Sequence, residues 1–196
     1  MKGKNYANRK PESERPLNDF YQTPKCMTWE LLNTNYLQNH NVKCILDPCC
    51  GKSAIGNELL KSGFFLSEGD LIYGQDFLSD IYDTSTYDAI VMNPPFKLFN
   101  KFVEKAKEIS PIVCCIGKPN FFGAHDRNIN GLWKNLEWVY IFDRQIAYDK
   151  PFREDGKVEC GMMISGWFIW NKNYDGEPKI KVIDMQKYIL KGKQND

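Results

Sequence analysis

The sequence lacks the residue patterns that mark metal centres, disulfide frameworks and membrane proteins. Its 196 residues include only two histidines, and its seven cysteines show no C-x-x-C spacing. An odd number of cysteines without that spacing argues against a zinc site or a set of disulfides, and favours reduced thiols in the cytoplasm. The longest apolar stretches, such as 161–170, are too short to span a membrane, and the N-terminus is too polar for a signal peptide. We therefore expect neither a metal ion nor a membrane partner.

The sequence also lacks an excess of charge of either sign. Its 26 Lys and Arg residues and 25 Asp and Glu residues leave a net charge of +1. Such a chain has no global basic field of the kind that drives strong non-specific binding to nucleic acids, although local basic patches are compatible with it. The length suits one domain with a sizeable core. We expect a flexible polar arm over 1–16, the domain over 17–175, and an extension with one short strand over 176–196.

Short apolar runs alternate along the chain with amphipathic segments. The runs predict strands at 42–46, 64–70, 87–92, 111–116, 138–142, 164–170 and 179–183. Helices are expected at 54–61, at 97–109 and over about 12 residues from Lys25, with a loop or short helix at 130–136. Thr23 suits the N-cap of the helix from Lys25, and Pro24 suits its first position. This alternation predicts an α/β fold with a mainly parallel sheet, and the last strands of the domain, which lack an intervening helix, predict an antiparallel pair at one edge.

The stretch 43–57 combines a strand, a tight turn with Gly51 and the start of a helix. Such a junction directs backbone N–H groups and a helix dipole at a ligand. Two ligands compete for it: a nucleotide phosphate held by Gly51-Lys52-Ser53, or a nucleoside-containing cofactor held by Asp47. The phosphate-binding loop requires an earlier glycine where this chain has Leu46, which disfavours that reading.

Carboxylates stand at the ends of successive predicted strands. Asp47 ends the first strand, and Asp70 ends the second at about the 20-residue spacing expected for a carboxylate that binds ribose hydroxyls. Glu68 competes with Asp70 for that role, since alternate residues of a strand face opposite sides. Asp76-Phe77 then offers a hydrogen-bonding group and a ring for an adenine. The order of these residues favours a nucleoside cofactor.

Asn93-Pro94-Pro95-Phe96 directly follows the strand predicted at 87–92. Two successive prolines remove two N–H donors and fix the backbone. The resulting rigid turn presents an amide oxygen, a carbonyl oxygen and an aromatic face. These groups suit a planar amine or amide.

In this order the motifs resemble those of the S-adenosylmethionine-dependent N6-adenine DNA methyltransferases: Asp47-Pro48-Cys49-Cys50-Gly51, Asp70, Asp76-Phe77 and Asn93-Pro94-Pro95-Phe96. Tyr21-Gln22-Thr23-Pro24 resembles the cofactor-binding segment that precedes the core in the amino-methylating DNA enzymes. The resemblance runs from about residue 20 to about residue 170. It implies a single-domain Rossmann-like class I methyltransferase fold, with a mostly parallel seven-stranded sheet and a reversed edge hairpin. Ser53 departs from the family, which usually has glycine there.

The resemblance also implies a role for each motif. Asp47, Pro48, Cys49 and Gly51 would border the methionine part of the cofactor, with Thr23 and Pro24 over its carboxylate end; Asp70 would bind the ribose, and Asp76 with Phe77 the adenine. Asn93 and the Pro94 carbonyl would accept the two hydrogens of the target amine, on a turn held by Pro95. Phe96 would stack on the target base.

Several substrates present a planar amine, so the substrate stays open at this point. Adenine in DNA is the reading that we favour, and adenine in RNA and a protein glutamine are the alternatives. A third reading is a catalytically silent cofactor-binding or DNA-binding module. The sequence shows no separate target-recognition domain, so we expect recognition by loops 118–130 and 143–159, which carry basic and aromatic residues, or by a partner subunit.

Overall fold

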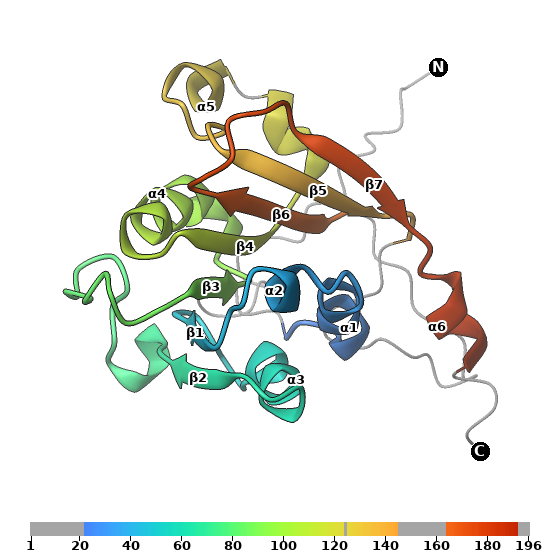
Figure 1. Cartoon of the computed structure of the whole chain (residues 1–196), viewed down its shortest axis with the longest axis horizontal. Coiled ribbons are helices and arrows are strands. Elements are labelled where there is room, and N and C mark those ends of the chain that lie inside the picture. Colours follow the sequence, from blue (N-terminus) through green and yellow to red (C-terminus); the bar gives the residue numbers. More distant parts are fainter. Residues whose placement is uncertain (1–21, 124, 145–163, 192–196) are drawn as a thin grey trace, which may run out of the picture.

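The computed structural model describes residues 22–123, 125–144 and 164–191. Its centre is one seven-stranded sheet with the strand order β2-β1-β3-β4-β6-β5-β7 (Figure 1). The strands are β1 Cys44–Asp47, β2 Phe65–Glu68, β3 Ala89–Met92, β4 Ile112–Gly117, β5 Leu136–Phe142, β6 Gly166–Asn171 and β7 Lys179–Ile183.

Most neighbouring strands are parallel, as the sequence predicts. β1 pairs in parallel with β2 and β3, and β3 pairs in parallel with β4. β6 runs antiparallel to both β4 and β5, which gives the predicted reversed hairpin. β7 then adds in parallel to β5 and forms the outermost strand on that side. The predicted α/β class and the mostly parallel seven-stranded sheet are confirmed.

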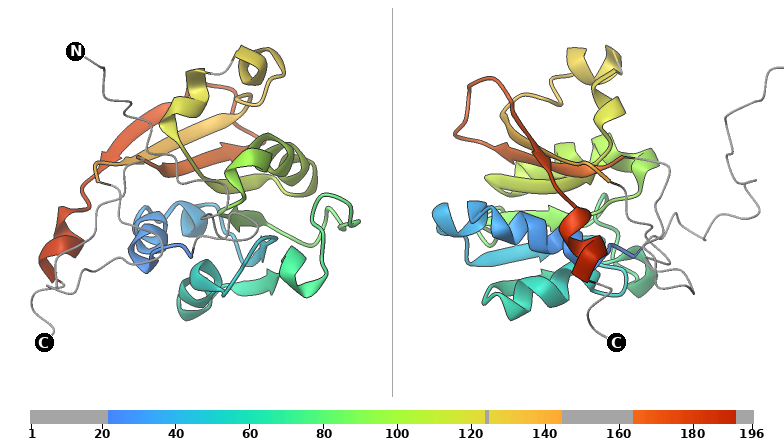
Figure 2. Two further views of the ribbon diagram at one scale, coloured as in Figure 1. Left: turned by 180° about the vertical axis from the view of Figure 1, so that it is seen from behind. Right: turned by 90° about the vertical axis from the view of Figure 1, so that its right-hand side faces the viewer.

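Helices cover both faces of the sheet. The helical segments are α1 Lys25–Asn33, α2 Tyr36–Asn39, α3 Ala54–Lys61, η3 Leu71–Tyr73, η4 Phe96–Leu98, α4 Phe99–Ile109, η5 Pro119–Gly123, α5 His125–Ile129 and α6 Gln186–Lys191. Figure 2 shows α6 leaving the sheet at β7 and returning toward α1, where the Tyr188 hydroxyl hydrogen-bonds the Glu30 carboxylate.

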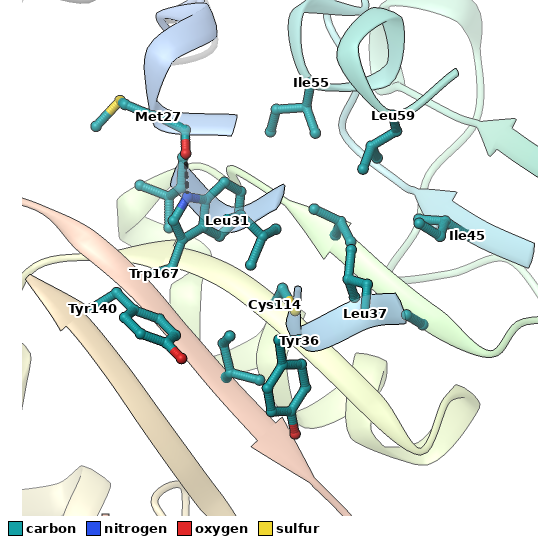
Figure 3. Packing of buried hydrophobic residues seen from close by; sticks show 14 of the residues in the cluster. Met27, Leu31, Tyr36, Leu37, Ile45, Ile55, Leu59, Cys114, Tyr140 and Trp167 are labelled. Carbon is teal, nitrogen blue, oxygen red and sulfur yellow. Dashed lines mark hydrogen bonds between the residues drawn. The ribbon is translucent and has the colours of Figure 1, made fainter. Parts of the chain in front are cut away.

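Strand alternation divides the buried side chains into two cores. Ile45 on β1 packs in the core beneath α1, α2 and α3, whereas its neighbour Leu46 packs in the core beneath α4. Figure 3 shows the first core, in which the Trp167 indole nitrogen donates to the Met27 carbonyl oxygen at 2.7 Å. This bond ties β6 to α1 and satisfies a buried donor that would otherwise be costly. The hydrogen bond thereby holds α1 against the sheet.

The first helix differs from the sequence prediction in its N-cap and in its C-terminal end. It begins at Lys25 as expected, but Pro24 is its N-cap and no side chain caps it, so the assignment of Thr23 as N-cap was wrong. The helix ends at Asn33, and Asn35 in the left-handed region separates it from α2. The Thr23 hydroxyl has another partner, described below.

Two other predicted segments also changed. The helix at 97–109 is a 3₁₀ turn followed by α4, and the short helix expected near 130–136 lies earlier, at His125–Ile129. The predicted arm at 1–16 and most of the loop at 143–159 fall outside the described residues. Within the described ranges, no helix is long and apolar enough to cross a bilayer.

Candidate active site

A pocket lies at the carboxyl ends of β1, β2 and β3, which is where ligands bind in open α/β sheets. The sequence-predicted residues that line it are Thr23, Asp47, Pro48, Cys49, Gly51, Asp70, Asp76, Phe77, Asn93, Pro94, Pro95 and Phe96. Pro24 is buried beside it but does not line it. The parallel strands thus bring motifs from four separate parts of the chain to one cavity.

The glycine loop after β1 is tethered to the end of β2. The Gly51 amide donates to Asp70 Oδ2 at 2.8 Å, and the Cys50 amide donates to the Gly69 carbonyl oxygen at 3.0 Å. Gly51 needs its glycine because its φ is +55°, in the left-handed region. These two hydrogen bonds to residues after β2 therefore fix the shape of the loop.

Ser53 turns away from the pocket. Its hydroxyl donates to Glu68 Oε2 at 3.0 Å, and Ser53 is not among the residues that line the cavity. It adopts a φ of +57°, a region that favours glycine, so the hydrogen bond offsets some backbone strain. The other Glu68 oxygen lies close to α3, where a Cβ added to Gly56 would be 2.2 Å from it.

Asp47 is a fully buried carboxyl group at the base of the pocket. Its Oδ1 accepts a hydrogen bond from the Cys49 amide at 3.2 Å, whereas Oδ2 is buried without a partner. Burial raises the pKa of Asp47 most, the Cys49 amide lowers it, and the nearby Glu68 and Asp70 carboxylates raise it again, so that it stands at about 8. An unpartnered buried carboxyl oxygen of this kind suits a ligand that brings a cationic or N–H donor.

Asp70 and Asp76 both help to shape their own loops. Asp70 accepts the Gly51 amide on Oδ2 and the Ile72 amide on Oδ1, the latter at 3.0 Å. Asp76 accepts the Leu78 amide at 3.0 Å. Each carboxylate retains further lone pairs, because two oxygens offer about four acceptor sites. Their predicted contacts to ribose and adenine stay predictions.

Sequence reasoning missed an apolar part of the pocket wall. Phe77 is only 2% exposed, and its ring packs at 5.3 Å from the Phe102 and Tyr82 rings. Leu71 and Ile72, by contrast, line the pocket and are 61% and 51% exposed. These two residues offer a planar ligand more accessible apolar surface than Phe77 does. The signal was present in the sequence as an apolar pair directly after Asp70.

Asn93 is oriented by a residue far away in the sequence. Its side-chain nitrogen donates to the Thr23 hydroxyl oxygen at 3.0 Å. This bond uses the amide nitrogen, so the amide oxygen is the acceptor that Asn93 can offer to an N–H donor in the pocket. The segment before α1, misjudged as a helix cap, therefore acts on the Asn-Pro-Pro-Phe turn.

An aromatic ring and two cysteines also border the pocket. Phe96 lines the pocket, with the Lys118 ammonium 4.1 Å from its ring centroid and the Phe121 ring edge-on at 6.0 Å. Burial raises the pKa of the Cys49 thiol well above its usual range and that of Cys50 to about 12. These thiols stay protonated at neutral pH, so neither is a nucleophile.

Comparison with known proteins gives structural matches only. No family model matches the sequence, and no curated protein is similar to it at a significant level. A protein described as a candidate RNA methyltransferase from Pyrococcus horikoshii matches with a TM-score of 0.56 and 18% identity, over 81% of this chain and 90% of that one. A precorrin-6y C5,15-methyltransferase from Geobacter metallireducens matches with a TM-score of 0.41 and 10% identity, over 77% of this chain and 93% of that one.

A third match is a protein described as a candidate hemolysin from Lactococcus lactis, with a TM-score of 0.48 and 11% identity, over 89% of this chain and 99% of that one. At these identities a likeness shows the fold alone. The Pyrococcus match establishes a Rossmann-like α/β fold of the methyltransferase type, as the sequence predicts.

Proposed function

We propose that this chain transfers a methyl group from S-adenosylmethionine to the exocyclic N6 of adenine in DNA. The observation that carries the proposal is the orientation of Asn93, whose amide nitrogen is held by Thr23 at 3.0 Å. An acceptor oxygen is then presented beside the two prolines, in the same pocket as Asp47. A site for a planar amine and a site for a cationic group thus adjoin each other.

The chain's own residues fit the cofactor. Its methionine end carries an ammonium group, and the unpartnered Asp47 Oδ2 is a matching acceptor. Leu71 and Ile72 provide exposed apolar surface next to Asp70, which suits a nucleoside. The fold resemblance to methyltransferases supports the same cofactor. When bound, S-adenosylmethionine supplies a methyl group on a positively charged sulfur, which is already activated for transfer.

The residues of the Asn-Pro-Pro-Phe turn have the task of positioning the amine. The lone pair of the adenine amine is delocalised into the ring, so the free amine is a poor nucleophile. Hydrogen bonds from its two N–H groups to the Asn93 side-chain oxygen and the Pro94 carbonyl oxygen keep the lone pair directed at the methyl group. Orientation and preorganised acceptors of this kind supply much of the lowering of a barrier. No nucleophilic side chain is required: the nitrogen–carbon bond would form as the sulfur–carbon bond breaks, the sulfur would keep that electron pair as a neutral thioether, and the amine would release one proton to water.

Phe96 is suited to hold the base itself. Its ring lines the pocket directly after the two prolines, and it is partly exposed. An enzyme that reacts with a base must take it out of the stack, and an aromatic face then replaces the lost stacking. The cations next to Phe96, Lys97 in sequence and Lys118 in space, favour a polyanionic substrate over a protein glutamine.

RNA adenine is the second candidate. One observation favours it, namely that the Pyrococcus protein with the same fold is described as a candidate RNA methyltransferase. The amine is identical in both polymers, so the turn at Asn93 serves either substrate equally well. The polymers differ at the ribose 2′-hydroxyl, which contacts outside the amine site would have to distinguish.

The deciding experiment is an assay with methyl-labelled S-adenosylmethionine and separate pools of DNA, RNA and protein, each digested to identify the labelled unit. N6-methyldeoxyadenosine from the DNA pool supports the proposal, and N6-methyladenosine from the RNA pool alone supports the second candidate. Label on a protein glutamine contradicts both. Tight cofactor binding with no label in any pool identifies a silent cofactor-binding module. Asn93→Ala is the matched control, because it removes the acceptor oxygen and leaves Asp47 intact.

A further inference from the structure

The segment that follows β4 lies against the Asn-Pro-Pro-Phe turn. Met92 on β3 pairs with Cys115 on β4, so the residues after both strands emerge at the same edge of the sheet. Gly117 allows a close fit there, since a Cβ on it would lie 3.0 Å from atoms of the Phe99 and Phe168 rings. The chain therefore delivers Lys118 directly beside Phe96, and η5 follows.

Lys118 and Phe96 form one cation–aromatic pair. The Lys118 ammonium lies 4.1 Å from the centroid of the Phe96 ring, well within the range of an attractive contact. Phe121 meets Phe96 edge-on at 6.0 Å and also packs on Phe99 at 4.7 Å. The ring that borders the pocket is thus fixed by a charge and by a second ring.

Arg127 and Phe121 form the next pair. The Arg127 guanidinium carbon lies 4.4 Å from the Phe121 ring centroid. Arg127 Nε donates to Asn100 Oδ1 at 2.6 Å, and its Nη1 donates to the Phe121 carbonyl oxygen at 3.3 Å. These three contacts hold a long side chain in one arrangement, so little rotamer entropy remains to be lost when it meets a ligand.

We propose that Lys118, Phe96 and Arg127, supported from beneath by the buried Phe121 ring, form a platform for the polynucleotide strand that flanks the target adenine. The proposal deepens the proposed function, on which it rests, by assigning where the strand runs. Two fixed cations, one over the partly exposed Phe96 ring and one over Phe121, suit the phosphates on either side of a base stacked on Phe96. Of the described residues in 117–129, Asp126 is the single carboxylate, so this segment carries a net positive charge. Lys118 and Arg127 are positioning residues for the strand, because they touch neither the amine nor the methyl group.

The test compares charge-removing variants of equal length. Lys118→Met and Arg127→Met remove the platform cations, and Lys181→Met on the far edge strand β7 removes an exposed charge as a control. Lys118→Arg keeps the charge over Phe96. Each protein is titrated with labelled single strands of about 20 nucleotides, longer than the roughly 4–16 nucleotides that such surfaces cover, in deoxyribose and ribose forms and at several salt concentrations. S-adenosylmethionine affinity, KM for the strand and kcat are measured alongside.

Lys118→Met and Arg127→Met are each expected to weaken strand binding roughly tenfold and to lower the slope of log affinity against log salt by about one. The weaker binding raises the KM for the strand, whereas cofactor affinity and kcat change less than about twofold. Lys118→Arg and Lys181→Met behave like the unmodified protein. If strand affinity and salt slope are unchanged in both Lys118→Met and Arg127→Met, the platform proposal is overturned. The deoxyribose and ribose strands show which polymer it accepts.

The outcomes separate the platform from the reaction. If the unmodified protein binds strands through Lys118 and Arg127 but labels no adenine, the platform is supported and the proposed reaction fails. If the unmodified protein labels adenine, and Lys118→Met and Arg127→Met label it with an unaltered KM for the strand, the reaction is supported and the platform fails. Thermal melting of Arg127→Met, which also loses the bond to Asn100, checks that its fold is intact.

Discussion

The two halves of the pocket are built in different ways. The half at the ends of β1 and β2 is shaped by backbone hydrogen bonds to carboxylates, such as those from Gly51 and Ile72 to Asp70. The half after β3 has prolines that donate no backbone hydrogen bond, and it is shaped by the Thr23 contact to Asn93 and by aromatic and cationic packing at Phe96.

This difference separates binding from reaction. Carboxylates suit the hydroxyls and the cationic end of a cofactor, whereas rings and cations suit a base and its phosphates. A change in the half at β1 and β2 should therefore alter the affinity for the cofactor and spare kcat. A change in the half after β3 should alter kcat or kcat/KM and spare the affinity for the cofactor. Substitutions at four positions test this separation, in order of decreasing effect.

Asn93→Ala should give the largest effect, a fall in kcat of about a thousandfold, because it removes an acceptor that orients the amine. Cofactor affinity should change only a few-fold. Single-turnover transfer of labelled methyl groups measures the first quantity, and calorimetric titration of S-adenosylmethionine measures the second. Equal losses in both constants would show that Asn93 serves the cofactor and would break the comparison.

Asp47→Asn should weaken cofactor binding roughly a hundredfold, since it removes one partner of a buried charge pair. The raised pKa of Asp47, about 8, predicts that binding tightens as the pH rises from 6 to 8 and the carboxylate forms. The Asn variant should lack this dependence. Titrations at several pH values test it, and a slope that survives in the variant would assign the pH effect to another group.

The same substitution should stabilise the ligand-free protein at pH 8. A group whose pKa is higher in the folded state contributes stability that is complete below its unfolded pKa, and that contribution is lost as the pH rises through about 8. The neutral amide avoids this loss. The loss begins above the unfolded pKa of roughly 4, so melting curves at pH 6 and pH 8, with the exposed Asp175→Asn as control, should show a gain at both pH values that is larger at pH 8.

Phe96→Ala should lower kcat/KM by about ten- to a hundredfold, the worth of one base stacked on an aromatic ring. Phe96→Tyr keeps a ring face and should retain most of the activity. Steady-state rates over a range of oligonucleotide concentrations separate the two constants. Unaltered kinetics in Phe96→Ala would show that Phe96 does not stack on the target base.

Ser53 substitutions should give the smallest effects. Ser53→Ala loses the hydrogen bond to Glu68 and keeps the left-handed backbone, so it should destabilise by about 1 kcal/mol. Ser53→Gly loses the same bond but relieves the strain, and should be close to neutral. Denaturant unfolding measures both. Cofactor affinity that tightens tenfold in the Gly variant would show that Ser53 does narrow the methionine site.

The sequence by itself determined the order of the seven strands and of the longer helices, but not the short helices α2 and α6. Hydrophobic periodicity predicted the helix at 54–61 and the strand at 179–183 with their observed bounds, because such patterns report which face of a local segment is buried. Motifs at strand ends predicted which residues meet, since parallel strands place their carboxyl ends at one edge. The N-cap of the first helix was predicted one residue too early, at Thr23 in place of Pro24.

Only the tertiary structure decided how these residues are set chemically. The raised pKa of Asp47 comes from complete removal from water, which no local pattern encodes. The Asn93 amide is oriented by Thr23, and Lys118 is placed over Phe96 by the packing of β4 against β3. Each of these features depends on contacts between residues far apart in the chain. Periodicity and motif spacing describe neighbours along the chain, so they could name these residues but not their partners.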